Sequence, residues 1–153
     1  MLKKQRFNQK GATLLEVLVT VAVLSVGLLG VAGLLMKSTS LGISAHDRTI
    51  STQKIYAFAD RMRLNPQGVN DGNYNDLSGA PSDPNCLATG CTPAQIAALD
   101  FFQWSQELAG SMAGGGGSVA RNGNLFLVTV NWQGKGLDLL ATVNQTYSLS
   151  VRP

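Results

Sequence analysis

The sequence KKQRFNQKGATLLEVLVTVAVLSVGLLGVAGLL, residues 3–35, decides the fold. Three lysines and one arginine precede Gly11, and a long apolar run follows that contains a single acidic residue, Glu16. The twenty residues from Val17 to Met36 carry no charge. In a helix, a run of that length rises about 30 Å, which is the thickness of the hydrocarbon core of a bilayer. The stretch therefore predicts a membrane-spanning helix.

The length and flanks of the apolar run distinguish a retained helix from a removed signal. The apolar region of a secretory signal peptide covers roughly 7–15 residues and leads to a small-residue cleavage site. The present run is longer, so we favour a retained helix. Basic residues beside a membrane helix stay in the cytoplasm. We therefore expect the N-terminus inside and residues 37–153 across the membrane.

The positive charge of the chain belongs to its first residues. The whole sequence has 12 Lys and Arg against 9 Asp and Glu, and four of the twelve basic residues lie within residues 1–11. Without that leader the counts are eight and nine, a net charge of −1. The body of the protein thus has no excess of basic residues with which to neutralise phosphates, and we expect no nucleic-acid partner.

The helical pattern continues beyond the membrane segment. Four apolar residues recur at steps of three and four and form one face: Ile55, Phe58, Ala59 and Met62. The pattern ends where Pro66 disfavours helix at Asn65. We predict one helix from about residue 13 to 64, with a transmembrane half over 12–36 and an amphipathic half over 37–64.

Residues 65–153 are predicted to form the exported head. Residues 65–92 are rich in turn-forming residues and are expected to be a loop. Thr92, Pro93 and Gln95 then form the signature of a helix start with a capping box. The helix is predicted over about 93–109, with Gly110 placed to end it. Its apolar stripe consists of Ala97, Phe101, Trp104 and Leu108.

The last part of the chain has the alternation of β-strands, predicted over about 118–152. Asn122-Gly123 signals a hairpin turn before the alternating run LFLVTVNW. The glycine-rich segment AGGGGS, residues 113–118, lacks the Gly-Lys-Ser/Thr ending of a phosphate loop and is expected to be a flexible linker. An antiparallel sheet with one packed face, laid on the amphipathic half of the long helix, gives an α+β fold.

Cys86 and Cys91 are the two cysteines of the chain, and they lie in the predicted loop. In an exported domain such a pair indicates a disulfide that closes a small surface loop. The alternatives are a pair of free thiols or half of a metal site. Zinc would need two further ligands, and His46 is the only histidine.

No residue pattern argues for catalysis. Ser44, His46 and Asp47 are close in sequence, but near neighbours on a helix do not face one another. The carboxylates of Asp71, Asp76 and Asp83 lack the spacing of a calcium-binding EF-hand. We therefore expect a protein that is not an enzyme, with no catalytic residues, no metal and no cofactor.

The segment KGATLLEVLVTVAVLSVGLLG resembles the class III leader and N-terminal helix of type IV pilins and of the pseudopilins of type II secretion. The resemblance implies that prepilin peptidase removes residues 1–11 by cutting between Gly11 and Ala12. It also implies N-methylation of Ala12 and places Glu16 fifth in the mature chain. Two residues depart from the usual pattern: Ala12 stands where phenylalanine is common, and Gly33 where major pilins commonly have proline.

The rest of the chain resembles PilV-type minor pilins. The resemblance rests on DRMRLNP, on the cysteine loop followed by CTPAQIAALDFFQW, on the glycine-rich segment and on the closing VTVNW and YSLSVRP. It implies a type IV pilin-like fold and a minor pilin that helps initiate pilus assembly. The implied partners are other minor pilins, the major pilin and a tip adhesin. The implied location is the bacterial inner membrane with a periplasmic head, and after assembly the cell-surface pilus used for adhesion and twitching motility.

Within this resemblance Glu16 has an assembly role. Cleavage would leave a positive amine on Ala12, and in a helical bundle the amine of one subunit could neutralise Glu16 of its neighbour. Since an unpaired carboxylate is unfavourable away from water, the pair would favour docking in register. The alternative is a carboxylate tolerated at the membrane interface. Two other functions stay open: a type II secretion pseudopilin, and an uncleaved, membrane-anchored periplasmic binding domain that acts alone.

Overall fold

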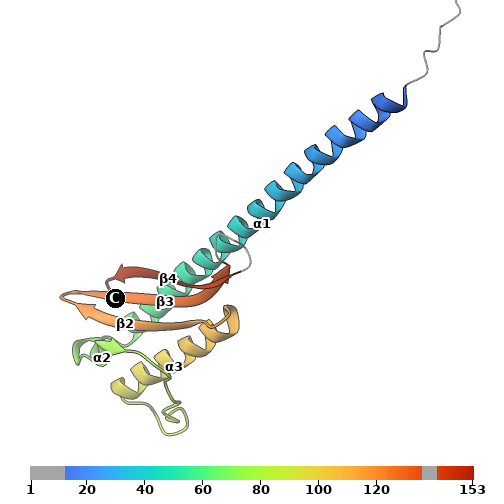
Figure 1. Cartoon of the computed structure of the whole chain (residues 1–153). Helices are drawn as coiled ribbons and strands as arrows, with labels where there is room; N and C mark the ends of the chain where they lie inside the picture. The colour runs from blue at the N-terminus through green and yellow to red at the C-terminus, as the bar shows by residue number, and fades with distance from the viewer. Residues whose placement is uncertain (1–12, 136–140) are drawn as a thin grey trace, which may run out of the picture. The chain divides into compact units, whose positions relative to one another are not determined.

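The computed structural model describes residues 13–135 and 141–153 (Figure 1). The chain divides into two compact units, Met1–Thr39 and Ser40–Pro153. Helix α1, Leu14–Leu64, contributes residues to both units. Its bounds agree with the helix predicted from the apolar periodicity and from Pro66.

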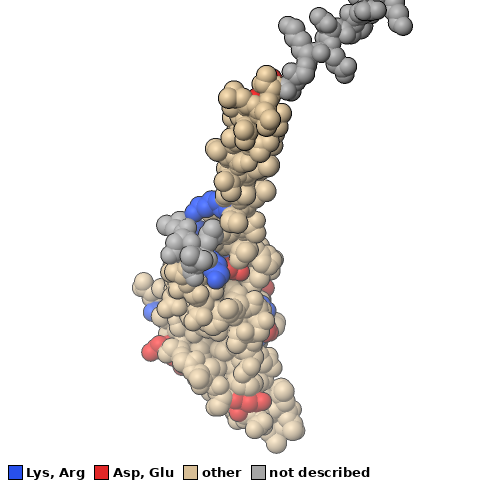
Figure 2. All heavy atoms as spheres, turned by 45° about the vertical axis from the view of Figure 1, so that its right-hand side comes forward, with Lys and Arg blue, Asp and Glu red and all other residues tan. Residues whose placement is uncertain are grey.

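The part of α1 in the first unit exposes its side chains on all sides. Between Leu14 and Met36 the large apolar residues are 51% to 83% exposed. Figure 2 shows this segment without charged side chains beyond the acidic group near its start. Among the described residues, α1 is the one helix that is long and apolar enough to cross a membrane. A helix that is apolar all round needs lipid or other helices around it, which indicates membrane anchoring.

The second unit contains the rest of α1, two further helices and one sheet. All strand pairs are antiparallel, and the strand order is β1-β2-β3-β4 (Figure 1). The bounds of the remaining elements are α2 Pro66–Asn70, β1 Asp76–Leu77, α3 Pro93–Ser111, β2 Gly116–Asn122, β3 Leu125–Lys135 and β4 Thr142–Val151.

One core joins α1, α3 and the inner face of the sheet. Alternate residues of β3 point inward and are buried, as the period of two predicts. The core residues are Ile55, Phe58, Ala59, Met62, Tyr74, Ala97, Phe101, Trp104, Leu108, Met112, Val119, Phe126, Val128, Val130, Trp132 and Val151. The four apolar residues predicted on the amphipathic half of α1 and the four predicted on α3 all belong to it. This confirms the α+β fold with a long N-terminal helix.

The loop predicted over residues 65–92 contains two short elements that the sequence reasoning missed. Asn65 ends α1 and also caps α2, because its side chain accepts a hydrogen bond from the backbone N–H of Gly68. Pro66 occupies the first turn of α2, where its missing N–H costs nothing. The same Asn-Pro pair therefore ends one helix and begins the next. The short strand β1 follows and pairs with β2.

The glycine-rich segment is not a flexible linker. Strand β2 begins at Gly116, and Gly116 and Gly117 pair with Asn131 and Val130 of β3. The predicted end of α3 is also slightly wrong, since the helix runs through Gly110 to Ser111 and is capped at Met112. After α3 the chain turns back tightly, and Gly115 provides the space for its approach to the backbone of Leu108.

The hairpin between β2 and β3 is shifted by one residue from its prediction. Asn122 pairs with Leu125, so the two loop residues are Gly123 and Asn124. Gly123 has a φ of 61°, and Asn124 is not among the residues with positive φ. A glycine with positive φ at the first loop position, and only there, is typical of a type II′ turn.

Candidate functional site

The first turn of α1 contains Glu16, the residue predicted to act in assembly. The backbone N–H of Glu16 donates to the carbonyl of Thr13 at 3.0 Å and approaches the Thr13 hydroxyl at 3.4 Å. The carbonyl of Thr13 also accepts from Val17. Thr13 is therefore the N-cap, and Glu16 stands three residues later in an exposed position. Gly11 and Ala12, the predicted cleavage and methylation residues, lie outside the described residues.

The sequence reasoning missed the local role of this pair. Thr13-Leu14-Leu15-Glu16 has the spacing of a capping box, in which threonine accepts from the N–H three residues on. A carboxylate in the first turn is also favoured by the partial positive charge of the helix N-terminus. Glu16 thus has a local reason to lie there besides the role between subunits that was predicted from the sequence. A control that removes the cap alone can distinguish the two.

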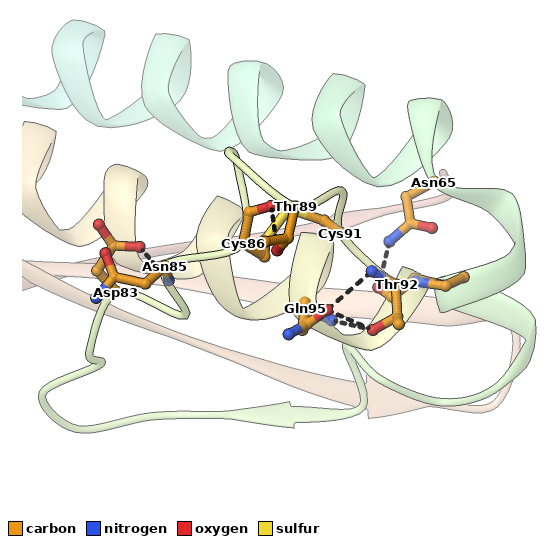
Figure 3. Close-up of a disulfide and its surroundings, with 9 residues drawn as sticks. Asn65, Asp83, Asn85, Cys86, Thr89, Cys91, Thr92 and Gln95 are labelled. Atoms are coloured by element: carbon orange, nitrogen blue, oxygen red, sulfur yellow. Dashed lines mark hydrogen bonds between the residues drawn. A yellow bond between two sulfur atoms is a disulfide. The ribbon is translucent and has the colours of Figure 1, made fainter.

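The disulfide loop lies in the second unit, before α3. The structure joins Cys86 and Cys91, with their Cα atoms 4.9 Å apart (Figure 3). Cys86 is buried, whereas Leu87 at the start of the enclosed loop is 73% exposed. Asn85 adopts a positive φ of 51°, and its N–H donates to the Asp83 carboxylate at 2.9 Å. The bridge therefore fixes the turn from inside while the enclosed residues face solvent.

The start of α3 directly follows this bridge. The Thr92 hydroxyl accepts from the backbone N–H of Gln95 at 3.3 Å, and the Gln95 side chain accepts from the N–H of Thr92 at 3.0 Å (Figure 3). These are the two reciprocal bonds of a capping box, as the sequence predicts. Cys91 immediately precedes the cap, so the disulfide restrains the residue from which the helix starts.

We expect the double variant Cys86→Ser/Cys91→Ser to lower the free energy of unfolding of the second unit by about 1–3 kcal/mol, because closing so short a loop restricts the unfolded chain only modestly. Limited proteolysis of membrane-embedded protein should cut the variant faster than wild type between Asn65 and Gly110. Anchoring should be unchanged. Two results would contradict this expectation. One is free thiols in wild-type protein extracted from membranes without reductant, and the other is equal rates of proteolysis for the variant and the wild type.

A buried polar cluster around Asn65 joins the end of α1 to α3. The Asn65 amide nitrogen donates to the Tyr74 hydroxyl at 3.0 Å and to the carbonyl of Pro93 at 2.8 Å. Tyr74 in turn donates to the Asp100 carboxylate at 2.6 Å. Burial raises the pKa of Tyr74, and its hydrogen bond to Asp100 raises it further. Burial also raises the pKa of Asp100, while the bond from Tyr74 and the charge of Arg61 oppose that change.

A second polar cluster links α1 to α3 on a more exposed surface. Glu107 forms ion pairs with Lys54, at 2.9 Å, and with Arg61. Partial burial works to raise the pKa of Glu107, but the hydrogen bonds and charges of these two partners outweigh it and lower the pKa. Every polar side chain in both clusters has a partner, so the clusters hold α3 in place rather than offering reactive groups.

The structure does not assemble a catalytic or metal site from the other residues considered. The Ser44 hydroxyl donates to the carbonyl of Ser40, one turn earlier, and not to His46. Within residues 13–135 and 141–153, no group of three or more His, Cys, Asp or Glu side chains could hold a metal ion. Asp71, Asp76 and Asp83 therefore do not form such a group.

Comparison with known proteins identifies the N-terminal segment. Residues 6–32 match the family model of the prokaryotic N-terminal methylation motif. The matched range includes Gly11, Ala12 and Glu16 and extends through most of the apolar run. Comparison with curated proteins and with solved structures gave no match. The motif supports a type IV pilin-like protein, of the pilin or pseudopilin kind, that is anchored in a membrane by its N-terminal helix.

Proposed function

We propose that the protein is a non-enzymatic minor pilin of the PilV type, which helps to initiate assembly of a type IV pilus in a tip complex. Its partners would be other minor pilins, the major pilin and a tip adhesin. The observation that carries the pilin-like part of the proposal is the methylation motif over residues 6–32, continued by the exposed apolar part of α1, and the PilV-type part rests on the sequence resemblance. Before assembly the chain would lie in the bacterial inner membrane, with its second unit in the periplasm.

The exposed apolar surface of α1 supports assembly through helix packing. Side chains from Leu14 to Met36 make no core of their own, so they must face lipid or neighbouring helices. Helices that move from lipid into a filament gain little from the hydrophobic effect, because lipid is equally apolar. Polar groups then determine the register, and Glu16 is the one acidic residue at the start of this surface.

Processing gives the first test. If prepilin peptidase acts on the chain, the mature protein begins at Ala12 and keeps the whole apolar helix, because the basic leader stays on the cytoplasmic side. Intact-mass measurement of the protein from the membrane fraction should show this N-terminus, with or without one added methyl group. An N-terminus near Ser38 would exclude a pilin, and an intact leader would favour the stand-alone binding domain.

Glu16→Ala should leave membrane insertion intact and reduce co-purification with partner pilins by at least about tenfold, because the amine of the neighbouring subunit loses its buried partner. Thr13→Ala is the matched control, since it removes the N-cap and leaves the carboxylate. We expect Thr13→Ala to keep most of the association.

If Thr13→Ala and Glu16→Ala reduce co-purification equally, the role of Glu16 is to cap the helix alone. If Glu16→Ala co-purifies with its partners as wild type does, the pairing of Glu16 with a neighbour's amine is contradicted. The identity of the captured partners distinguishes the two filament systems. Pilus subunits support the proposal, whereas secretion-system subunits would make the chain a pseudopilin.

A further inference from the structure

The two edges of the sheet are built differently. One edge is β1, which has two residues, one of them the charged Asp76. The other edge is β4, which has ten residues paired with β3 in continuous register from Thr142 to Val151. On an edge strand of an antiparallel pair, alternate residues direct their backbone N–H and C=O groups away from the sheet. The free side of β4 is thus a long row of backbone donors and acceptors.

Strand β4 lacks the features that normally protect such an edge. Proteins blunt exposed edges with short strands, lysines, prolines, bulges or inward-pointing charges. The sequence of β4, TVNQTYSLSV, contains no charged residue and no proline, and its pairing with β3 is unbroken. Within the described part of the chain, no backbone hydrogen bond joins β4 to any segment other than β3. β1, by contrast, is short and carries a charge.

The side chains along β4 indicate what kind of segment would fit. On the inner row, Tyr147 and Leu149 pack against the core but stay partly exposed, and Val143 is 36% exposed. A neighbouring strand with apolar residues at alternate positions would cover them. The outward row holds only uncharged polar residues: Thr142, Asn144, Thr146, Ser148 and Ser150. A charged neighbour would find no counter-ion on either row.

We propose that the free edge of β4 is a docking site for an extended, uncharged segment of a partner protein with apolar residues at alternate positions. The segment adds as a fifth strand, held by backbone hydrogen bonds, and its inward side chains cover Tyr147 and Leu149. This goes beyond the proposed function, since it assigns a second contact surface apart from α1. It can be tested without pilus assembly, so its failure would leave that function untouched.

The probe is a synthetic peptide with the sequence of Leu125–Gly134 of β3, because this stretch is uncharged, already pairs with β4 on the other side and has the required alternation. The labelled peptide is titrated into the full-length protein in detergent micelles. We expect saturable binding and, at saturation, exchange of alternate β4 amides slowed by at least about tenfold. A peptide of the same composition in scrambled order should not bind.

Two lysine variants distinguish peptide binding at the edge of the sheet from binding on its face. Gln145→Lys puts a charge on the inner row of β4, where an added strand would bury it, and should weaken peptide binding by at least about tenfold. Asn131→Lys puts the same charge on the exposed outward row of the central strand β3 and should change binding by less than about twofold. Thermal unfolding confirms that both variants are folded, and Val143→Lys, on the same inner row of β4 and more exposed, replaces Gln145→Lys if that variant is not.

Three results would overturn the proposal. The first is the absence of added amide protection at saturating peptide. The second is an equal loss of binding in the edge and face variants, which would place the peptide on the sheet face. The third is protection of β4 that rises with protein concentration and needs no peptide, which would assign the edge to a second copy of the chain.

Discussion

Gly115→Ala is expected to destabilise the second unit severely, by about 3 kcal/mol or more, because its added methyl group would overlap backbone atoms. A Cβ at this position would lie 2.7 Å from the carbonyl carbon of Leu108, closer still to its oxygen, and 3.0 Å from the oxygen of Met112. These atoms belong to the last turn and cap of α3 and cannot move without shifting the helix. The α3–β2 connection must therefore open or α3 must lose its last turn.

Gly110→Ala is the matched control for this prediction. Gly110 lies inside α3, and no atom lies within 4 Å of a Cβ built there. Alanine should therefore stabilise the helix, by up to about 1 kcal/mol. Denaturant unfolding of full-length protein in micelles, followed by tryptophan fluorescence, measures both variants. The two variants should change the free energy of unfolding in opposite directions. A loss below about 1 kcal/mol for Gly115→Ala would show that the α3–β2 connection can relax.

The glycine-rich segment shows where sequence reasoning reaches its limit in this chain. Composition favoured a linker, because four consecutive glycines have high conformational freedom in isolation. In the fold, Gly115 and Gly117 approach α3 too closely for a Cβ atom. Gly116 and Gly117 are held by pairing with β3. These contacts depend on how the chain turns back after α3, and composition alone does not predict that turn. The hairpin shift has a similar origin, since the pairing of Asn122 with Leu125 determines the loop.

The elements that sequence did predict depend on local rules. The end of α1 follows from Pro66, and the start of α3 follows from Thr92 and its capping box. The buried faces of α1, α3 and β3 follow from the period at which their apolar residues recur. Asn65 and Tyr74 were missed because a buried polar side chain has no periodic signal. Only the tertiary fold brings Tyr74 to Asp100, and a lone tyrosine in a polar loop was the one hint available.

The same limit applies to the candidate site. The basic leader, Gly11, Ala12 and Glu16 form a linear motif, so they could be read directly from the sequence, and the last three lie within residues 6–32, which match the methylation motif. The capping geometry of Thr13 was readable in principle from the Thr-x-x-Glu spacing. The free edge of β4 was not, because a sequence shows which residues form a strand but not which strand lies at the border of the sheet.

Trp104→Ala is expected to lower the free energy of unfolding by about 3–5 kcal/mol, as is typical when a large aromatic side chain is removed from a core. Trp104 is fully buried, its ring centroid lies 4.7 Å from that of Phe58, and its indole N–H donates to the carbonyl of Lys54 at 3.0 Å. The ring joins α3 to α1 and also lies against β2. Its loss removes a contact with each of them, and the same unfolding measurement reports it.

Gly117 of β2 lies against this ring and provides a sharper test of the contact between α3 and β2. A Cβ at Gly117 would overlap the far edge of the Trp104 indole, so Gly117→Val alone should cost about 1–3 kcal/mol. In the Trp104→Ala background, however, the valine enters the space that the ring has left. The double variant should therefore be more stable than the sum of the single losses predicts, by about 1–3 kcal/mol.

Phe126→Ala supplies the control pair for this double-mutant cycle. Phe126 is buried in the same core but pairs with Arg121, four residues along β2 from Gly117. Its cavity should not accommodate the valine, so Gly117→Val and Phe126→Ala should add within about 0.5 kcal/mol. If Gly117→Val couples with Trp104→Ala and not with Phe126→Ala, a glycine is required at position 117 because the indole lies against it. Additivity in both pairs would mean that Gly117 is required by the backbone of β2 and not by the ring.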